Sequence, residues 1–399
     1  MSKFTKVKLK DCATFINGMA FKPIDWDVKG LPIVRIQNLT GTNKNFNYYS
    51  KEYNPKFEIN NGDLLISWSA SLGVFIWNDG KAILNQHIFK VVFDKIEINK
   101  KYFYFCILDV LEEMSEKTHG SAMRHITKGD FDNIEIPLPP LQEQERIVGI
   151  LDESFANIDE SIKNLEQDLL NLDELMQSAL QKAFNPLKDN AKENYQLPQG
   201  WEWKSLGDIG FFIRGVSYKK EQLLTMKDKK SIYLLRANNI QNELNLDDLQ
   251  IIPRELAFDK IIQNNDILFA MSSGSKHIVG KNILLNNLND FTFGAFCGLF
   301  RINNLNISHK FIAFYLKSDF YKKYIFNISK GSNINNLRFT DLENLQIPLP
   351  PLQEQEQIAS YLDELSLNIK DLKQNYQTQI KNLQELKKSL LDRAFKGRL

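Results

Sequence analysis

The chain has 399 residues, of which 43% are hydrophobic and 25% charged, and its net charge is +1. This length can form two or three domains with buried cores, and the composition is ordinary for a globular protein. No apolar run approaches the roughly 18 residues that a membrane-spanning helix needs, so we expect no membrane segment.

The N-terminal residues and the cysteines indicate the compartment. The first residues have no apolar stretch behind them of the kind that a signal peptide carries. The three cysteines, Cys12, Cys106 and Cys297, are widely separated and lack the spacing of a disulfide framework or a zinc site. We therefore expect buried thiols in a reducing, cytoplasmic environment.

A tandem duplication organises the chain. Residues 136–145 read IPLPPLQEQE, and the same ten residues return at 347–356, an offset of 211. Ten identical residues in a row indicate duplication, and the offset holds without a gap as far as Phe184 and Phe395. Nearer the start of each copy the similarity is weaker and the offset drifts. An invariant part joined to a variable part is typical of a scaffold that carries recognition loops.

The repeat divides the chain into four parts. In chain order we predict a first globular domain over residues 1–137, a central helix over 138–187, a second globular domain over 188–348 and a C-terminal helix over 349–399. The net charge is +2 for residues 1–140, −7 for 141–184, +5 for 185–351 and +1 for 352–399. The mildly basic domains permit binding of nucleic acid without requiring it.

The central segment is predicted to be one long helix. It follows Pro139 and Pro140, and proline is tolerated in the first turn of a helix. From Leu151 to Ala183 apolar residues recur in alternating steps of four and three, which is the seam of a coiled coil. About 33 helical residues of this kind would extend roughly 50 Å.

The C-terminal segment repeats the seam less perfectly from Leu362 to Ala394. Polar residues take three of its positions, namely Ser366, Lys373 and Lys387, and three leucines lie beside it where they would shift the contact, namely Leu365, Leu372 and Leu386. We expect the two helices to pair with each other, antiparallel, because an intrachain partner has a high effective concentration. A coiled coil that only joins two molecules is the alternative.

Motifs that resemble catalytic or cofactor sites are incomplete. Residues 274–282 resemble a phosphate-binding loop, but five residues separate the glycines and Asn282 replaces the Ser or Thr that would hold magnesium. The five histidines lack metal-ligand spacing and are expected to be structural. The two PLPP segments match a minimal PxxP ligand, although stiff elbows between a strand and a helix are the favoured interpretation. We predict no catalytic centre.

The motifs resemble one known family. The doubled IPLPPLQEQ followed by a heptad helix is similar to the conserved regions of the specificity (S) subunits of type I restriction-modification systems, as are LPQGWEWKSLGD at 197–208 and AFKG at 394–397. The first domain departs from this pattern because it lacks the LPxGW start. The resemblance implies an α/β (α+β) fold, in which two similar target recognition domains are separated by two long helices. These helices would form an antiparallel coiled coil in a pseudo-two-fold tandem repeat.

The resemblance also implies a function. The chain would be a non-catalytic subunit that recognises double-stranded DNA and binds no cofactor itself. Two methyltransferase (modification) subunits would join it as an adenine-N6 methylase that uses S-adenosylmethionine. Two restriction (endonuclease/translocase) subunits would use ATP and magnesium. Each domain would read half of a bipartite, asymmetric target, with domain centres roughly 10–15 base pairs apart at about 3.4 Å per pair.

Two rival interpretations stay open. One is a specificity domain of a fused restriction enzyme, which would need catalytic motifs elsewhere in the chain. The other is a coiled-coil scaffold that binds no nucleic acid. For the favoured interpretation, base contact is expected from polar and basic loop side chains. The candidates are Arg35, Gln37, Asn38, Ser69, Ser71, His119, Ser121 and Arg124 in the first domain, and Arg236, Asn238, Asn239, Ser273, Ser275, Lys276, Lys330, Ser332 and Asn333 in the second.

Overall fold

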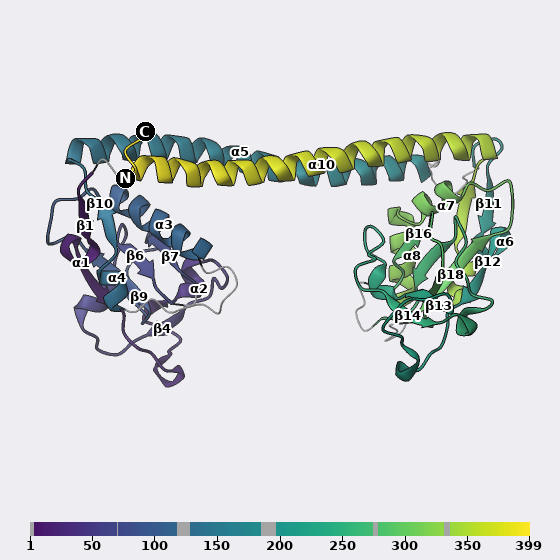
Figure 1. Ribbon diagram of the computed structural model, residues 1–399, viewed down its shortest axis with the longest axis horizontal. Coiled ribbons are helices and arrows are strands. Elements are labelled where there is room, and N and C mark those ends of the chain that lie inside the picture. The colour runs from purple at the N-terminus through teal and green to yellow at the C-terminus, as the bar shows by residue number, and fades with distance from the viewer. Residues whose placement is uncertain (1–3, 70, 118–127, 185–196, 274–277, 331–335) are drawn as a thin grey trace. The chain divides into compact units, whose positions relative to one another are not determined.

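A computed structural model describes residues 4–69, 71–117, 128–184, 197–273, 278–330 and 336–399. The chain divides into two compact units, each with a globular part and part of both long helices (Figure 1). Unit 1 comprises Met1–Glu166 and Tyr376–Leu399, and unit 2 comprises Gln167–Asn375. The predicted class, two similar α/β domains with a pair of long antiparallel helices, is confirmed.

The globular part of unit 1 contains two four-stranded sheets and a short ribbon. One sheet is antiparallel and has the order β2 (Thr14–Asn17), β9 (Ile88–Val92), β6 (Leu64–Ser67), β7 (Gly73–Ile76). The second has the order β4 (Asn47–Tyr49), β3 (Leu31–Val34), β8 (Ala82–Leu84), β5 (Glu58–Ile59), with β3 and β8 parallel. The ribbon pairs β1 (Lys6–Lys8) with β10 (Glu135–Pro137). The helices are α1 (Leu9–Cys12), α2 (Ile36–Leu39), α3 (Lys100–Lys117) and α4 (Lys128–Asp132).

Unit 2 repeats this plan. Its antiparallel sheet has the order β12 (Gly210–Arg214), β18 (Cys297–Ile302), β15 (Ile267–Ala270), β16 (Asn282–Leu284). A three-stranded sheet contains β14 (Gln250–Pro253), β13 (Ser231–Leu235) and β17 (Phe291–Phe293), with β13 and β17 parallel, and the ribbon pairs β11 (Glu202–Ser205) with β19 (Gln346–Leu349). Its helices are α6 (Leu206–Ile209), α7 (His309–Tyr315), α8 (Asp319–Lys330) and α9 (Phe339–Glu343).

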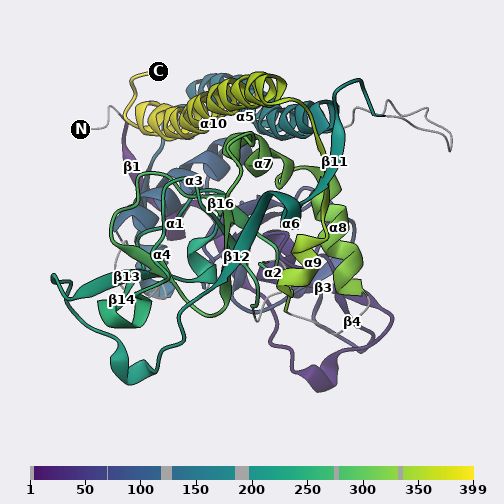
Figure 2. The same ribbon diagram turned by 90° about the vertical axis from the view of Figure 1, so that its right-hand side faces the viewer.

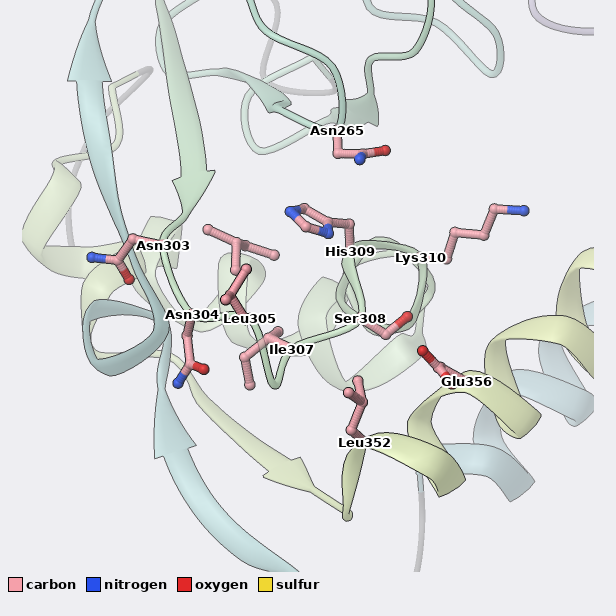
Figure 3. A pocket seen from close by; sticks show the side chains of 11 residues that line it. Asn265, Asn303, Asn304, Leu305, Ile307, Ser308, His309, Lys310, Leu352 and Glu356 are labelled. Atoms are coloured by element: carbon pink, nitrogen blue, oxygen red, sulfur yellow. The ribbon is translucent and has the colours of Figure 1, made fainter.

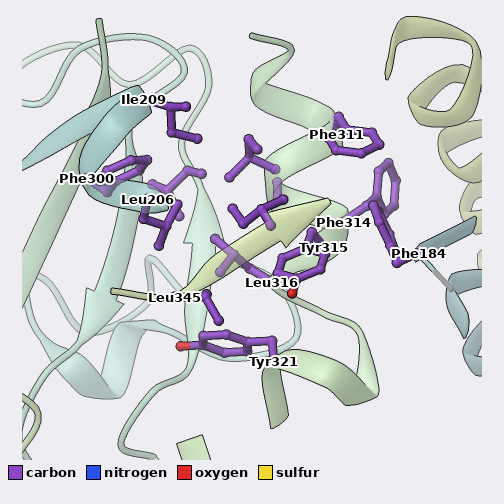
Figure 4. Close-up of a cluster of buried hydrophobic side chains, with 14 of the residues drawn as sticks. Phe184, Leu206, Ile209, Phe300, Phe311, Phe314, Tyr315, Leu316, Tyr321 and Leu345 are labelled. Carbon is purple, nitrogen blue, oxygen red and sulfur yellow. The ribbon is translucent and has the colours of Figure 1, made fainter. Parts of the chain in front are cut away.

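The main core of each unit joins its antiparallel sheet to the long helices. In unit 2 the Phe184 ring lies 5.1 Å from that of Phe311 and 5.3 Å from that of Tyr315, between centroids, so the end of one long helix is buried against α7 (Figure 4). In unit 1, Tyr102 of α3 contacts Phe395 near the end of the other long helix. The three cysteines are free and buried, as predicted. Each globular part is therefore fused to the helices by its own hydrophobic core.

The two long helices are α5 (Leu141–Phe184) and α10 (Leu352–Phe395), each of 44 residues. Both begin one residue after a proline pair, as predicted, and at about 1.5 Å per residue each extends roughly 66 Å. Every predicted seam position from Leu151 to Ala183 is buried or half-buried, and so is every predicted position of the second seam. The expectation that flanking leucines shift the contact was wrong for Leu372 and Leu386, which are exposed.

The seam lysines explain how an imperfect apolar stripe still pairs. In unit 1, Lys387 contacts Asp159 at 2.5 Å and lies 4.8 Å above the Phe155 ring. In unit 2, Lys373 contacts Asp173 at 2.5 Å. The partner number falls from 173 to 159 as the lysine number rises, so α5 and α10 run antiparallel. The acidic excess of α5 thus faces basic residues of α10, which favours pairing of unlike helices.

A buried glutamine holds each proline elbow. Gln144 accepts a hydrogen bond from the Asn99 amide and donates one to the Pro139 carbonyl, both at 2.9 Å. Gln355 does the same in unit 2, with the Ser308 amide at 2.9 Å and the Pro350 carbonyl at 2.8 Å. Because proline donates no backbone hydrogen bond, these amides tie the start of each long helix to the globular part beside it.

An aspartate eight residues after each glutamine makes a second connection. Asp152 of α5 pairs with Lys101 of α3 at 2.6 Å, and Asp363 of α10 pairs with Lys310 of α7 at 2.5 Å. The two aspartates are separated by the repeat offset of 211. Figure 2 shows α7 beneath the start of α10, where this pair forms. The identical motif therefore builds the same junction twice.

We predict that Gln355→Ala destabilises the elbow of unit 2 by about 1–3 kcal/mol, because the Ser308 amide and the Pro350 carbonyl lose their buried partner. The neighbouring Gln353, which is exposed, is the matched control, and Gln353→Ala should change stability by no more than about 0.5 kcal/mol. Hydrogen exchange of the amides in α7, with urea unfolding of both variants, measures the effect. Equal protection in the two variants would show that the buried amide is dispensable.

Candidate nucleic-acid interface

The two predicted arginines occupy equivalent places. Arg35 follows β3 and precedes α2, and Arg236 follows β13 and precedes a single helical turn, Ala237–Asn239. Each arginine directly follows a strand that pairs in parallel with another strand of its sheet: β3 with β8 in unit 1, and β13 with β17 in unit 2. The polar candidates of both domains thus begin at the same end of the corresponding sheet.

The asparagines that follow these arginines have a structural role. Asn38 accepts a hydrogen bond from the Arg35 amide at 3.0 Å, and its own amide group donates to the carbonyls of Asn43 and Asn45. Asn239 is equivalent: it accepts from the Arg236 amide at 2.8 Å and donates to the carbonyls of two loop residues, Asn245 and Asp248. Their amide groups hold loops together, so they have little capacity left to contact a base.

The arginine side chains differ between the domains. Arg236 donates from Nη2 to the carboxylate of Asp248 at 2.6 Å, whereas the Arg35 guanidinium lies 5.5 Å from the centroid of the Trp26 ring. In both residues Nε is buried without a hydrogen-bond partner. Neither guanidinium is a fully solvated surface group, and each retains unused donor capacity.

The remaining described candidates lie on nearby loops. Gln37 is half-buried in α2, and Asn238 is exposed beside Asn239. Ser69 is buried and Ser71 exposed just after β6, and Ser273 is half-buried after the equivalent strand, β15. The candidates His119, Ser121, Arg124, Ser275, Lys276, Ser332 and Asn333 lie outside the described residues, as does the side chain of Lys330 at the end of α8.

Three residues were missed by the sequence analysis. Trp68, Asn85 and His87 each carry a buried polar atom without a hydrogen-bond partner, and all three lie close to the end of β3 or β6. Their residue types give no signal in one dimension, because a buried unpaired atom becomes visible only when the neighbours are placed. His87 was expected to be a satisfied structural histidine, yet its Nδ1 has no partner.

A cavity of about 430 Å³ lies in unit 2 between the β18–α7 loop and the first turn of α10 (Figure 3). His309, Lys310 and Glu356 line it together with several asparagines. Burial lowers the pKa of His309, which favours its neutral form. The imidazole and the lysine amine point away from each other, so they do not form an acid–base pair.

The described part of the chain contains no group of three or more His, Cys, Asp or Glu side chains placed to hold a metal ion. It also contains no helix that is long and apolar enough to cross a membrane.

We predict that Asn239→Ala lowers the stability of unit 2 by about 1–3 kcal/mol, because the buried amide satisfies the Arg236 backbone and two loop carbonyls. The exposed neighbour provides the control, and Asn238→Ala should change stability by no more than about 0.5 kcal/mol. Denaturant unfolding and hydrogen exchange over residues 239–248 test the difference. If both variants behave alike, the amide does not organise the loop.

Comparison with known proteins places these features in a family. A family model described as the type I restriction modification DNA specificity domain matches residues 1–171 and 198–382. The specificity subunits of the type I restriction enzymes EcoKI (Escherichia coli, strain K12) and StySPI (Salmonella potsdam) are 38% and 37% identical over 206 residues. This match covers 51% of the chain and 44% of each relative's length. The EcoBI specificity subunit of Escherichia coli is 25% identical over 99% of the chain and 86% of its own length.

Solved structures share the fold. A chain from a type I R-M system, solved in a study of complex assembly and conformational transition, superposes with a TM-score of 0.76 at 20% identity and covers 99% of this chain and 98% of its own. The HsdS subunit of Thermoanaerobacter tengcongensis gives 0.59 at 21% identity, with 99% and 97% covered. Because the family model matches most of the sequence in two successive segments, the chain belongs to the family of type I restriction modification DNA specificity domains.

Proposed function

We propose that this chain is the sequence-specific DNA-recognition subunit of a type I restriction-modification complex, and that each domain reads one half of a bipartite, asymmetric target. The observation that carries the proposal is a duplicated scaffold with two dissimilar surfaces. The elbow is identical in ten residues and makes the same contacts in both units. The loops around Arg35 and Arg236 share a backbone arrangement but present different side chains.

The chain itself is proposed to be non-catalytic and to bind no cofactor. Two modification subunits would supply the adenine-N6 methyltransferase with S-adenosylmethionine, and two restriction subunits would supply the ATP- and magnesium-dependent endonuclease. The acting complex would be cytoplasmic. This assignment rests on the family and on the incomplete catalytic motifs of the sequence.

The long helices are proposed to dock the modification subunits. The exposed apolar residues of α10 are Tyr361, Leu367 and Leu372 in unit 2 and Leu386 in unit 1, and Tyr361 and Leu372 lie on the same face, about three helical turns apart. On α5, Leu170 and Leu175 are about half exposed. These side chains are available for contact with another protein, which is the support for this part of the proposal. The same helices would set the spacing between the half-sites.

Separate reading predicts separable defects. Arg35→Ala should relax one half of the target and Arg236→Ala the other, each by about 1–3 kcal/mol if the side chain contacts a base. Mapping methylated adenines in cells that express each variant with its modification subunits measures both halves. As a control, the purified chain alone should transfer no methyl group from labelled S-adenosylmethionine to DNA. Equal relaxation of both halves in either variant would show that the domains do not read separately. If the purified chain is not retained on duplex DNA, the scaffold interpretation is favoured.

The helices are predicted to act as a ruler. The ion pairs in the seam place Leu165 of α5 opposite the stretch of α10 around Ile380. Inserting one heptad after Leu165 and another after Ile380 therefore preserves the seam. This adds about 10 Å to each helix at about 1.5 Å per residue, and the unread gap should grow by roughly three base pairs. Methylation mapping identifies the new gap. The insertion also rotates one domain about the duplex, so methylation should be weaker. Continued use of the old gap would show that the helices do not set it.

A further inference from the structure

Buried polar atoms without partners are concentrated at one place in unit 1. Among the described residues, such side-chain atoms are Nε of Arg35, Nε1 of Trp68, Oδ1 of Asn85 and Nδ1 of His87, and in unit 2 Nε of Arg236. Most buried polar groups in folded proteins are hydrogen-bonded, so each exception requires an explanation. Four exceptions in one domain mark a place where hydrogen-bonding capacity of the described residues is unused.

Backbone contacts bring these residues together. The Asn85 amide donates to the carbonyl of Val34, the residue before Arg35, at 3.0 Å. The Trp68 amide donates to the His87 carbonyl at 3.2 Å, and the two rings lie 4.9 Å apart between centroids. The four side chains therefore belong to the adjoining ends of β3, β6 and β8 and the turn after β8.

The backbone at His87 is strained. Its φ is +70°, in the left-handed region that non-glycine residues adopt at some cost. Strained backbone persists where the surrounding structure enforces it, and it is concentrated at functional sites. Here it places the imidazole edge-on to Trp68, which in turn stacks on Phe89 at 5.6 Å.

Unit 2 contains equivalent backbone contacts with different side chains, although Phe296, the counterpart of His87, does not have a positive φ. The Met271 amide donates to the Phe296 carbonyl at 2.9 Å, as Trp68 does to His87. A Cβ on Gly215 would lie 2.0 Å from the Gly294 carbonyl oxygen.

Unit 1 has the same close approach. A Cβ on Gly18 would lie 2.0 Å from the Asn85 carbonyl oxygen, so Asn85 and Gly294 are equivalent. Met271 and Phe296 correspond likewise to Trp68 and His87. Trp68, Asn85 and His87 of unit 1 are therefore replaced by Met271, Gly294 and Phe296 in unit 2. Each unit keeps an arginine, Arg35 or Arg236, at the end of the neighbouring strand.

We propose, on the basis of the DNA-recognition function proposed above, that this place is the base-reading site of each domain. Trp68, Asn85 and His87 determine the specificity of the first domain, and Met271 and Phe296 that of the second. Arg35 and Arg236 are the element common to both sites. The chain reads two different half-sites because one frame carries a polar set in one domain and an apolar set in the other.

The residue types define what each site accepts. In unit 1 the Trp68 indole can only donate a hydrogen bond and the Asn85 oxygen can only accept one. Together they suit the edge of a base that presents both an acceptor and a donor, as adenine does in the major groove. In unit 2, Phe296 is 69% exposed and suits an apolar contact such as the methyl group of thymine.

A pair of tryptophan variants tests the first site. Trp68→Phe removes an N–H that has no partner, whereas Trp77→Phe removes one that donates to the Gly80 carbonyl at 2.6 Å. Both lose the same ring atoms, but Trp77 is buried and Trp68 is half-buried, so Trp77→Phe also loses more packing. Trp68→Phe should have the smaller loss of melting temperature and should reduce base preference in one half-site roughly tenfold. Trp77→Phe should lose more stability and keep the target unchanged.

The full chain, expressed with its modification subunits, is the protein to use, and mapping of methylated adenines reports each half-site separately. Phe296→Ala is the second arm, since an exposed side chain can be removed without unfolding the domain, and it should relax the other half-site. An unchanged target in Trp68→Phe or in Phe296→Ala would overturn the assignment of that site. If Trp68→Phe does not fold, the result for Phe296→Ala decides. A wild-type chain that directs no bipartite methylation would instead refute the proposed function.

Discussion

Each long helix leaves its globular part through two prolines, and this creates a local deficit of hydrogen-bond donors. The carbonyls of Pro139 and Pro350 are satisfied by the side chains of Gln144 and Gln355 from the first turn of the helix that follows. The side-chain oxygens of the same glutamines accept hydrogen bonds from the backbone amides of Asn99, just before α3, and Ser308, just before α7. In each unit the buried side-chain amide of one glutamine thus connects the proline elbow, the long helix that follows it, and the segment before α3 or α7. Removing it would loosen all three, because they meet at this point.

This constraint accounts for the contrast between the constant and variable parts of the chain. The elbow needs the two prolines, a buried glutamine in the first turn of the helix, and an aspartate that pairs with a lysine on the neighbouring helix. Few substitutions preserve all of these contacts. The ends of β3 and β13 need only backbone hydrogen bonds and a capping asparagine. Side chains beyond that frame are free to change. A duplicated scaffold can therefore carry two different recognition surfaces without altering its junctions.

The helix pair shows how charge substitutes for packing. Lysines occupy positions of the α10 seam that the repeat fills with isoleucine or methionine in α5. Each reaches an aspartate of α5 while its aliphatic part covers the seam, as amphipathic side chains commonly do. Two copies of α5 would bring like charges together, whereas α5 and α10 complement each other. The duplicated helices have thus diverged into partners.

The sequence by itself determined the duplication, the long helices and their seam, because periodicity and exact repetition are one-dimensional properties. It also located Arg35 and Arg236 at equivalent places, since strand-end motifs keep their order in both copies. It could not separate Asn38 and Asn239, whose amides hold loops, from neighbouring polar residues that are available to a ligand. It gave no signal for Trp68, Asn85 or His87. Whether a polar atom is satisfied depends on residues distant in the chain, so only the tertiary structure could decide which side chains are structural and which lack a partner.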